Sequence, residues 1–258
     1  MATTESLPSS QVPPIPWQTD PGPRRDDAAL FAWWRAHGGF NSQADPKQGI
    51  DLYNTLVSRH QSDEFTALSF QVGTQLTQLS YLELDAQAIA LHARWSQTTL
   101  EPGKSLAIVS RNPRSRIIAL LAAFRAGLVP TVLETTGPGR TIQEVTWLNP
   151  DLVHGDRDLI DLLPEDYQSR SVPLEGSVQP PPNSCGKQSP DVPALRFFNP
   201  YKPGPESVQS ISTGTLFNNL LRDSALVMGL GRGSRFASFR DYGPPSPFSE
   251  LCALFAGA

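Results

Sequence analysis

Apolar residues recur at helical spacing after residue 80, where a helix is predicted to begin. Ser80 and Glu83 form the pattern of a capping box, in which each side chain bonds the backbone amide of the other residue. The apolar residues that follow share one helical face: Leu84, Ala88, Leu91 and Trp95. Upstream, the stretches 65–70 and 75–79 flank Val72-Gly73-Thr74, which predicts a small β-hairpin.

A continuous apolar stretch at 105–110 predicts a buried strand. Asn112 is a favourable N-cap and Pro113 a favourable first helical residue, and Gly127 is a natural helix terminator. The residues 129–133 then form a second predicted strand. A strand–helix–strand unit of this kind gives parallel strands with a right-handed crossover. The pattern therefore predicts an α/β fold with a parallel sheet.

The pattern is weaker in the rest of the chain. A Pro-, Ser- and Gly-rich segment at about 171–194 has no periodicity and is predicted to be a mobile surface loop. The other predicted elements, in chain order, are a helix within 50–60, a turn at 137–140, a weak helix at 142–149, a strand at 152–154, a short helix at 156–163, a strand at 195–198, a helix at 216–228, a strand at 235–239 and a helix at 248–256.

The first 48 residues differ from the remainder in composition. Residues 1–26 are rich in Ser, Pro, Gln and Thr, which is typical of a disordered segment. A short helix over 28–37 carries Trp33 and Trp34, which either pack on the main body or dock on a partner. We therefore divide the chain into a flexible arm with a Trp-rich helix, 1–48, and a single domain, 49–258.

Charge and cysteine content exclude several classes of protein. The net charge of −4 provides no basic surface for nucleic acid. The strongest apolar run, Ile117 to Phe124, is far shorter than a membrane span, and the first 18 residues lack a signal-peptide pattern. Cys185 and Cys252 are the two cysteines, which suits a reducing compartment. We expect a cytoplasmic protein.

Candidate chemistry is sparse. The four histidines are far apart in sequence, so we assign no metal site and no catalytic residue: His37, His60, His92 and His154. The stretch 154–158 (HGDRD) lacks the carboxylate spacing of a calcium loop and is interpreted as a solvated turn. Ser212-Thr213-Gly214-Thr215 has the small residues that wrap a phosphate with backbone amides, but no lysine follows it. A helix N-cap explains the same four residues equally well.

Several segments resemble the acyl-adenylate-forming ligases, the AMP-binding superfamily. Residues 79–84 (LSYLEL) are similar to its opening LTYxEL segment, and 120–132 (LLAAFRAGLVPTV) to its second motif, LLAxLKAGxxYVP. The stretches 216–239 and 248–258 resemble the helix, turn and strand that follow the family's phosphate loop and the helix beyond them. The similarity spans 50–258 and is greatest to the adenylation domains of nonribosomal peptide synthetases. It implies the N-terminal subdomain of that fold, a parallel sheet with flanking helices and a small β-hairpin.

The sequence departs from the family where chemistry is expected. The family's phosphate loop, [ST]-[SG]-G-[ST]-T-G-x-P-K-G, corresponds to 199–208 (NPYKPGPESV), which places Glu206 at the loop lysine. A carboxylate there repels a triphosphate. The substrate motif FDxSVWE corresponds to YGPPSPFSE, in which Asp241 can replace the family's aspartate only after a shift. The resemblance also implies that the adenine and ribose contacts and the C-terminal lid lie outside this chain.

Three functions follow from the resemblance. The first is a truncated, degenerate adenylation module of nonribosomal peptide or acyl-chain metabolism, with a synthetase or carrier-protein partner and no ATP bound by this chain alone. The second is an active ATP- and Mg-dependent ligase segment completed by another chain. In it, Ser212, Thr213, Gly214 and Thr215 bind phosphate, Lys202 is a displaced cation and Asp241 binds a substrate amine. The third is a docking or scaffold protein.

Overall fold

The computed structural model describes most of the chain after residue 48. The described residues are 49–62, 66–72, 75–95, 101–133, 135, 137–172, 183–199, 202, 204–230, 233–236 and 247–257. They all belong to one structural unit, Pro46–Ala258. The predicted arm, with its Trp-rich helix, and Asp241 lie outside the described residues, so both remain predictions.

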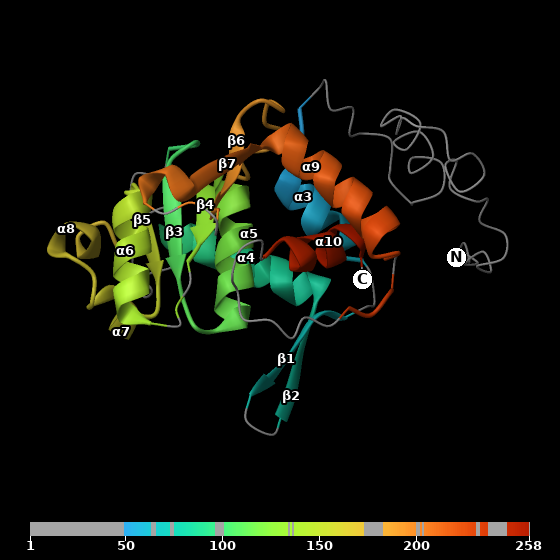
Figure 1. Ribbon diagram of the computed structural model, residues 1–258. Helices are drawn as coiled ribbons and strands as arrows, with labels where there is room; N and C mark the ends of the chain where they lie inside the picture. The colour runs from blue at the N-terminus through green and yellow to red at the C-terminus, as the bar shows by residue number, and fades with distance from the viewer. Residues whose placement is uncertain are drawn as a thin grey trace, which may run out of the picture. The chain divides into compact units, whose positions relative to one another are not determined.

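Three parallel strands form the central sheet (Figure 1). They are β3 (Ser105–Val109), β4 (Val129–Val132) and β5 (Leu152–Gly155), in the spatial order β4-β3-β5. Every residue of β3 is buried, as its continuous apolar sequence predicts. The predicted α/β class and the parallel pairing of the first two strands are confirmed.

Helix α5 (Pro113–Ala126) connects β3 to β4 and begins and ends where the sequence predicts. The Asn112 side chain accepts a hydrogen bond from the amide of Arg114 at 2.9 Å, and Gly127 ends the helix at a φ of 73°. Helix α4 (Tyr81–Trp95) packs against α5.

The predicted capping box fixes the start of α4. The Ser80 amide donates to Glu83 Oε2 at 2.8 Å, and the Glu83 amide donates to Ser80 Oγ at 3.2 Å. This reciprocal pair satisfies two backbone donors that have no partner within the helix.

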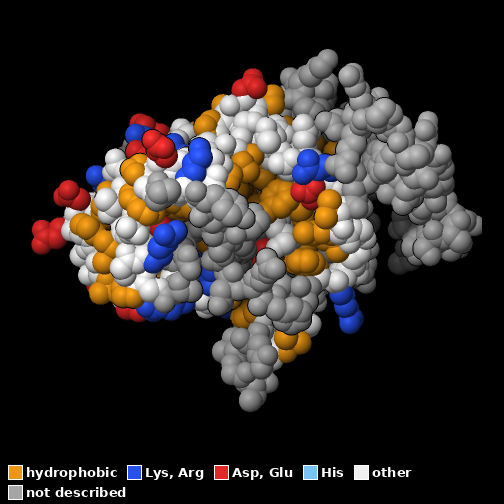
Figure 2. Space-filling model, viewed as in Figure 1, with side chains coloured by type: hydrophobic (Ala, Val, Ile, Leu, Met, Phe, Trp, Pro, Cys, Tyr) orange, Lys and Arg blue, Asp and Glu red, His pale blue; other side chains and the backbone are white. Residues whose placement is uncertain are grey.

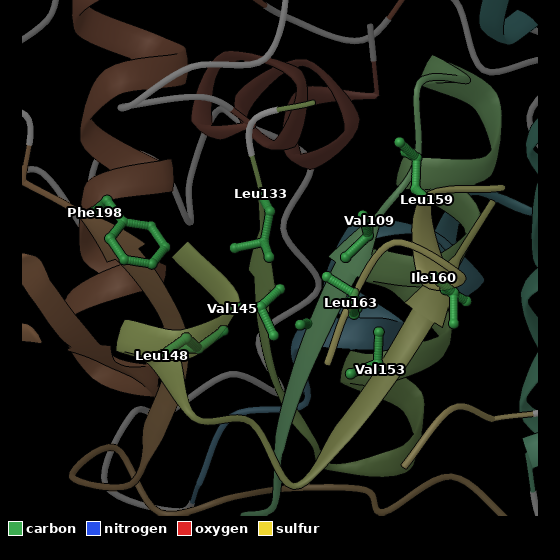
Figure 3. Close-up of a cluster of buried hydrophobic side chains, with 10 residues drawn as sticks. Val109, Leu133, Val145, Leu148, Val153, Leu159, Ile160, Leu163 and Phe198 are labelled. Carbon is green, nitrogen blue, oxygen red and sulfur yellow. The ribbon is translucent and has the colours of Figure 1, made fainter. Parts of the chain in front are cut away.

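Helices α6 (Pro138–Leu148) and α7 (Arg157–Ile160) cover the face of the sheet that lies away from α5. Helix α8 (Glu165–Gln168) follows α7. Helix α6 begins four residues before the predicted helix, because Pro138 occupies its first turn, where no amide donor is needed. The predicted turn at 137–140 is therefore wrong. The buried residues on this face form one cluster (Figure 3): Ala107, Val109, Leu133, Val145, Leu148, Val153, Leu159, Ile160, Leu163 and Phe198.

A short helix, a 3-10 turn and a β-hairpin precede α4. Strands β1 (Thr66–Val72) and β2 (Gln75–Ser80) pair antiparallel as the predicted hairpin, which projects from the body in Figure 1. The helix predicted within 50–60 is present as α3 (Leu52–Leu56) and a 3-10 turn, Ser58–His60.

The C-terminal third differs most from the prediction. Strand β6 (Pro193–Phe198) packs beside β4 and pairs antiparallel with β7 (Val208–Ser212), a strand that the sequence pattern did not indicate. Helix α9 (Thr213–Arg222) begins at 213 rather than 216 and continues as a π-helical turn, Asp223–Val227.

The last predicted helix is confirmed as α10 (Phe248–Ala256). Of the strand predicted at 235–239, residues 235 and 236 are described and are not in a strand, and the others lie outside the described residues. Among the helices that the structure describes, none has the length and apolar character needed to cross a bilayer.

Candidate phosphate-binding site

The predicted phosphate-binding residues lie at two positions around the β6–β7 hairpin. Ser212, Thr213, Gly214 and Thr215 span the junction where β7 ends and α9 begins. Lys202 is exposed in the connection between β6 and β7. The structure describes no position for Asp241, so the expected substrate-amine contact has no geometry to assess.

Ser212 has the geometry of a helix N-cap. Its Oγ accepts a hydrogen bond from the Thr215 amide at 3.3 Å and donates to Thr215 Oγ1 at 3.0 Å. Its backbone is extended, with φ −72° and ψ 159°, as N-cap residues require. The hydroxyl therefore satisfies one of the backbone donors exposed at the start of α9.

The next two amides donate to the segment that precedes β6. The Thr213 amide donates to the Val192 carbonyl at 2.8 Å, and Thr213 Oγ1 donates to the same oxygen at 3.1 Å. The Gly214 amide donates to the Pro190 carbonyl at 2.8 Å. A Cβ on Gly214 would lie 2.9 Å from Pro190 Cβ, so the two backbones are in close contact. The amides of residues 213–215 thus all donate to oxygens of the chain itself.

The segment at the family's loop position, 199–208, also closes on itself where it is described. The Asn199 amide donates to the Ser207 carbonyl at 2.7 Å, the Lys202 amide to the Asn199 carbonyl at 3.2 Å, and the Ser207 amide to the Gly204 carbonyl at 3.0 Å. Glu206 is exposed on a 3-10 turn that begins with Pro205. The amides of Asn199, Lys202 and Ser207 are therefore bonded within the β6–β7 hairpin and its connection.

Polar side chains also gather at the carboxyl ends of β3 and β5. The strand order reverses here, since β4 and β5 lie on opposite sides of β3. Open α/β sheets bind ligands at the carboxyl ends of their strands at such a point. Asp156 accepts hydrogen bonds from Ser110 Oγ and from the Arg111 amide, both at 2.7 Å. Arg111 also forms an ion pair with Asp158. The sequence interpretation treated 154–158 as a solvated turn and missed this role of Asp156. Only the register of β3 against β5 brings these residues together.

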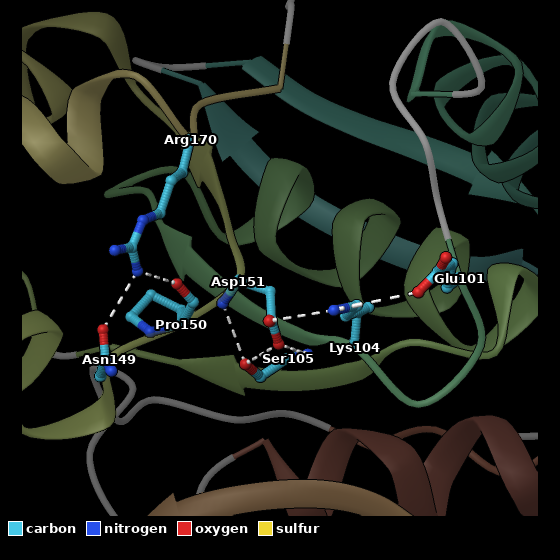
Figure 4. A network of polar contacts seen from close by, with 7 residues as sticks. All are labelled: Glu101, Lys104, Ser105, Asn149, Pro150, Asp151 and Arg170. Carbon is cyan, nitrogen blue, oxygen red and sulfur yellow. Dashed lines mark hydrogen bonds and ion pairs between the residues drawn. The ribbon is translucent and has the colours of Figure 1, made fainter.

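The amino ends of the same strands carry a second polar network (Figure 4). Asp151 accepts from the Ser105 amide at 2.8 Å and from Ser105 Oγ at 2.7 Å, and Lys104 Nζ lies 3.6 Å from its other oxygen. Arg170 donates to the Pro150 carbonyl at 2.9 Å. These contacts tie β3 to the start of β5 and support the sheet.

The described histidines and cysteines have structural surroundings. Burial lowers the pKa of His92 and that of His154 to about 4, and raises the pKa of Cys185 to about 11 and that of Cys252 to about 12. A protonated thiol is a poor nucleophile, and a buried imidazole with so low a pKa is a weak base. Among the described residues, no cluster of His, Cys, Asp or Glu has the arrangement of a metal site.

The surface charge in view is mixed. On the face drawn in Figure 2, Lys and Arg side chains are scattered among acidic and uncharged ones, without a continuous basic area in the described part of that face.

Comparisons with known proteins place the fold. No protein-family model matches the chain. Nonribosomal peptide synthetase 6 of Aspergillus fumigatus is 27% identical over 194 residues, which cover 69% of this chain and 14% of that protein. The solved nonribosomal peptide synthetase FmoA3, in an AMPPNP-bound form, superposes with a TM-score of 0.66 at 17% identity, covering 91% of this chain and 24% of that one.

A fatty acid AMP ligase from Legionella pneumophila also gives a TM-score of 0.66, at 15% identity over 84% of this chain and 40% of that one. The fold is that of the N-terminal part of an acyl-adenylate-forming ligase. The resemblance in the sequence is thereby confirmed at the level of the fold. The chain spans 14% of the synthetase it matches in sequence and 24–40% of these two solved adenylate-forming chains.

Proposed function

We propose that this chain is a degenerate adenylation module of nonribosomal peptide or acyl-chain metabolism that does not activate a carboxylic acid by itself. Its partner is a synthetase or a carrier protein, and its location is cytoplasmic, in keeping with two free cysteines. Similarity to Nonribosomal peptide synthetase 6 supports the metabolic context.

A single observation carries the proposal: the backbone donors at the start of α9 are already used. A phosphate-binding loop needs several amide groups directed at one anion. Here the amides of Thr213, Gly214 and Thr215 donate to Val192, Pro190 and Ser212. A phosphate must displace those acceptors before it can bind, so the residues as folded do not fit a triphosphate.

The charge at the family's loop position also disfavours the binding of a triphosphate. Glu206 stands where the resemblance places the loop lysine, and the exposed Lys202 lies four residues before it. Loss of one charge-assisted hydrogen bond costs about 1.5–3 kcal/mol, or one to two decades in affinity. Reversal of the charge adds repulsion to that loss.

ATP–pyrophosphate exchange tests the proposal. The isolated chain is incubated with Mg-ATP, labelled pyrophosphate and a mixture of amino and fatty acids. We expect no exchange above the level of a heat-denatured sample. Exchange that depends on an added acid would overturn the proposal.

A second function has specific support in the fold and in the partial coverage of the solved relatives. In it, the chain is one segment of a ligase that another chain completes, and ATP with a carboxylic acid gives acyl-AMP and pyrophosphate. Ser212, Thr213 and Thr215 then bind the phosphates, Lys202 supplies a cation and Asp241 binds a substrate amine. Exchange that requires a second, lid-bearing chain and is lost in Thr213→Ala would select this function over the first.

A further inference from the structure

A buried contact between two nitrogen side chains joins α4 to the end of α5. Arg125 Nη1 lies 2.7 Å from His92 Nδ1, and both residues are buried, with 9% and 5% exposure. A guanidinium has only donors, so His92 Nδ1 must be the acceptor and His92 must be neutral. The Tyr53 ring of α3 lies 5.8 Å from the Arg125 guanidinium, which brings a third helix to the same point.

The backbone of the same turn holds the segment 183–192, which we call the strap. The Cys185 amide donates to the Arg125 carbonyl at 2.9 Å, and Cys185 Sγ donates to the Phe124 carbonyl at 3.3 Å. Gln188 exchanges two backbone hydrogen bonds with Ile50, at 2.8 and 2.9 Å. This half of the Pro- and Ser-rich segment is therefore fixed to the body, in contrast to the mobility that its composition suggests.

The other end of the strap occupies the start of α9. Its Pro190 and Val192 carbonyls accept from the Gly214 and Thr213 amides, as described above. One short segment thus connects the His92–Arg125 contact to the candidate phosphate site, and its two ends are only a few residues apart in sequence.

We propose that the strap covers the first amides of α9 and that the His92–Arg125 contact holds the strap in place. Protonation of His92 then releases the strap. The inference deepens the proposed function, on which it rests, by naming what occupies the degenerate site. Protonation of His92 removes the acceptor and places two cations 2.7 Å apart in a buried position. The turn that holds Cys185 is then expected to open, and the strap to leave Thr213 and Gly214.

Ionisable groups of both signs lie on the elements packed around His92. Asp85 of α4 is a buried carboxylate, and it already accepts from Tyr53 at 2.7 Å, Ser58 at 3.1 Å and Gln61 at 2.5 Å. The other ionisable groups of the packed elements are Tyr81, Glu83 and Arg94 on α4, Arg114, Arg116 and Arg125 on α5, Asp51 and Tyr53 at α3, and Cys185, Lys187 and Asp191 on the strap.

Hydrogen exchange tests whether protonation of His92 releases the strap. The amide exchange rates of the whole chain are measured between pH 7 and pH 4 and corrected for the intrinsic exchange rates. Burial holds the pKa of His92 near 4 in the closed state, against 6.5 when exposed. The opening equilibrium therefore rises about tenfold for each pH unit below 6.5. We expect the amides of Cys185, Gln188, Thr213 and Gly214 to lose protection together, and at a higher pH than those of β3.

His92→Gln keeps an acceptor for Arg125 but does not titrate, so it should remove this pH dependence. His154→Gln is the matched control, since His154 is equally buried but lies in β5 and should leave the strap's pH dependence in place. The proposal is overturned if strap and α9 amides open independently, or if they lose protection only together with β3 in the wild-type chain. A His92→Gln variant that keeps the wild-type profile would also overturn it. Because no nucleotide is used, these results are independent of whether the chain binds ATP.

Discussion

The unit β3–α5–β4 and the unit β6–β7–α9 both keep the layout of an adenylate-forming ligase. They differ in what their polar groups bind. In the first, the Asn112 cap and Gly127 terminator complete a helix whose sides are buried. In the second, Ser212 and the strap use the donors that a phosphate site would need free. The contrast separates packing from ligand chemistry: both units keep their backbone layout, but in the second the first-turn amides of α9 already have acceptors within the chain.

Substitution of Gly155 should produce the largest effect on the parallel sheet. A Cβ at this position would lie 1.8 Å from the Val109 carbonyl oxygen, so β5 must shift away from β3. We expect Gly155→Ala to cost about 3 kcal/mol or more in the free energy of unfolding. Gly139→Ala is the control, since its Cβ meets nothing within 4 Å. Equal denaturant midpoints for the two variants would show that the β3–β5 contact is looser than described.

Acid should destabilise the sheet and its neighbouring helices through two neutral histidines. His92 and His154 both have a pKa near 4 when folded and 6.5 when unfolded, so the unfolded chain binds more protons below pH 6.5. Stability is therefore full above 6.5 and falls toward pH 4, by about 2 kcal/mol per histidine at pH 5. Denaturant titrations at pH 7 and 5 measure this, and His92→Gln should remove its own share. A pH-independent free energy of unfolding would contradict the neutral, buried assignment.

Two helix caps allow the units to be compared by the same substitution. Asn112→Ala and Ser212→Ala each remove a side-chain acceptor from a first-turn amide, and each should cost about 1 kcal/mol. Equal losses support a structural role for Ser212. If Ser212→Ala leaves thermal stability unchanged while Asn112→Ala lowers it, the hydroxyl is not a cap, and its assignment to phosphate gains support.

The sequence predicts the first unit well because its signals are local. Ser80 with Glu83, and Asn112 with Gly127, specify helix ends through groups a few residues apart. The second unit was predicted less well. Val208–Ser212 has no apolar alternation, and its strand character arises from pairing with β6. The occupation of the Thr213 and Gly214 amides depends on carbonyls at 190 and 192, which no short motif encodes.

Calorimetric titration of the isolated chain with Mg-ATP tests the central claim, that the site's donors are committed within the chain. We predict no binding heat at millimolar ATP, because a triphosphate must displace Val192 and Pro190 and approach Glu206. Micromolar affinity that disappears in Thr213→Ala or Thr215→Ala would contradict it and identify 212–215 as a working phosphate site.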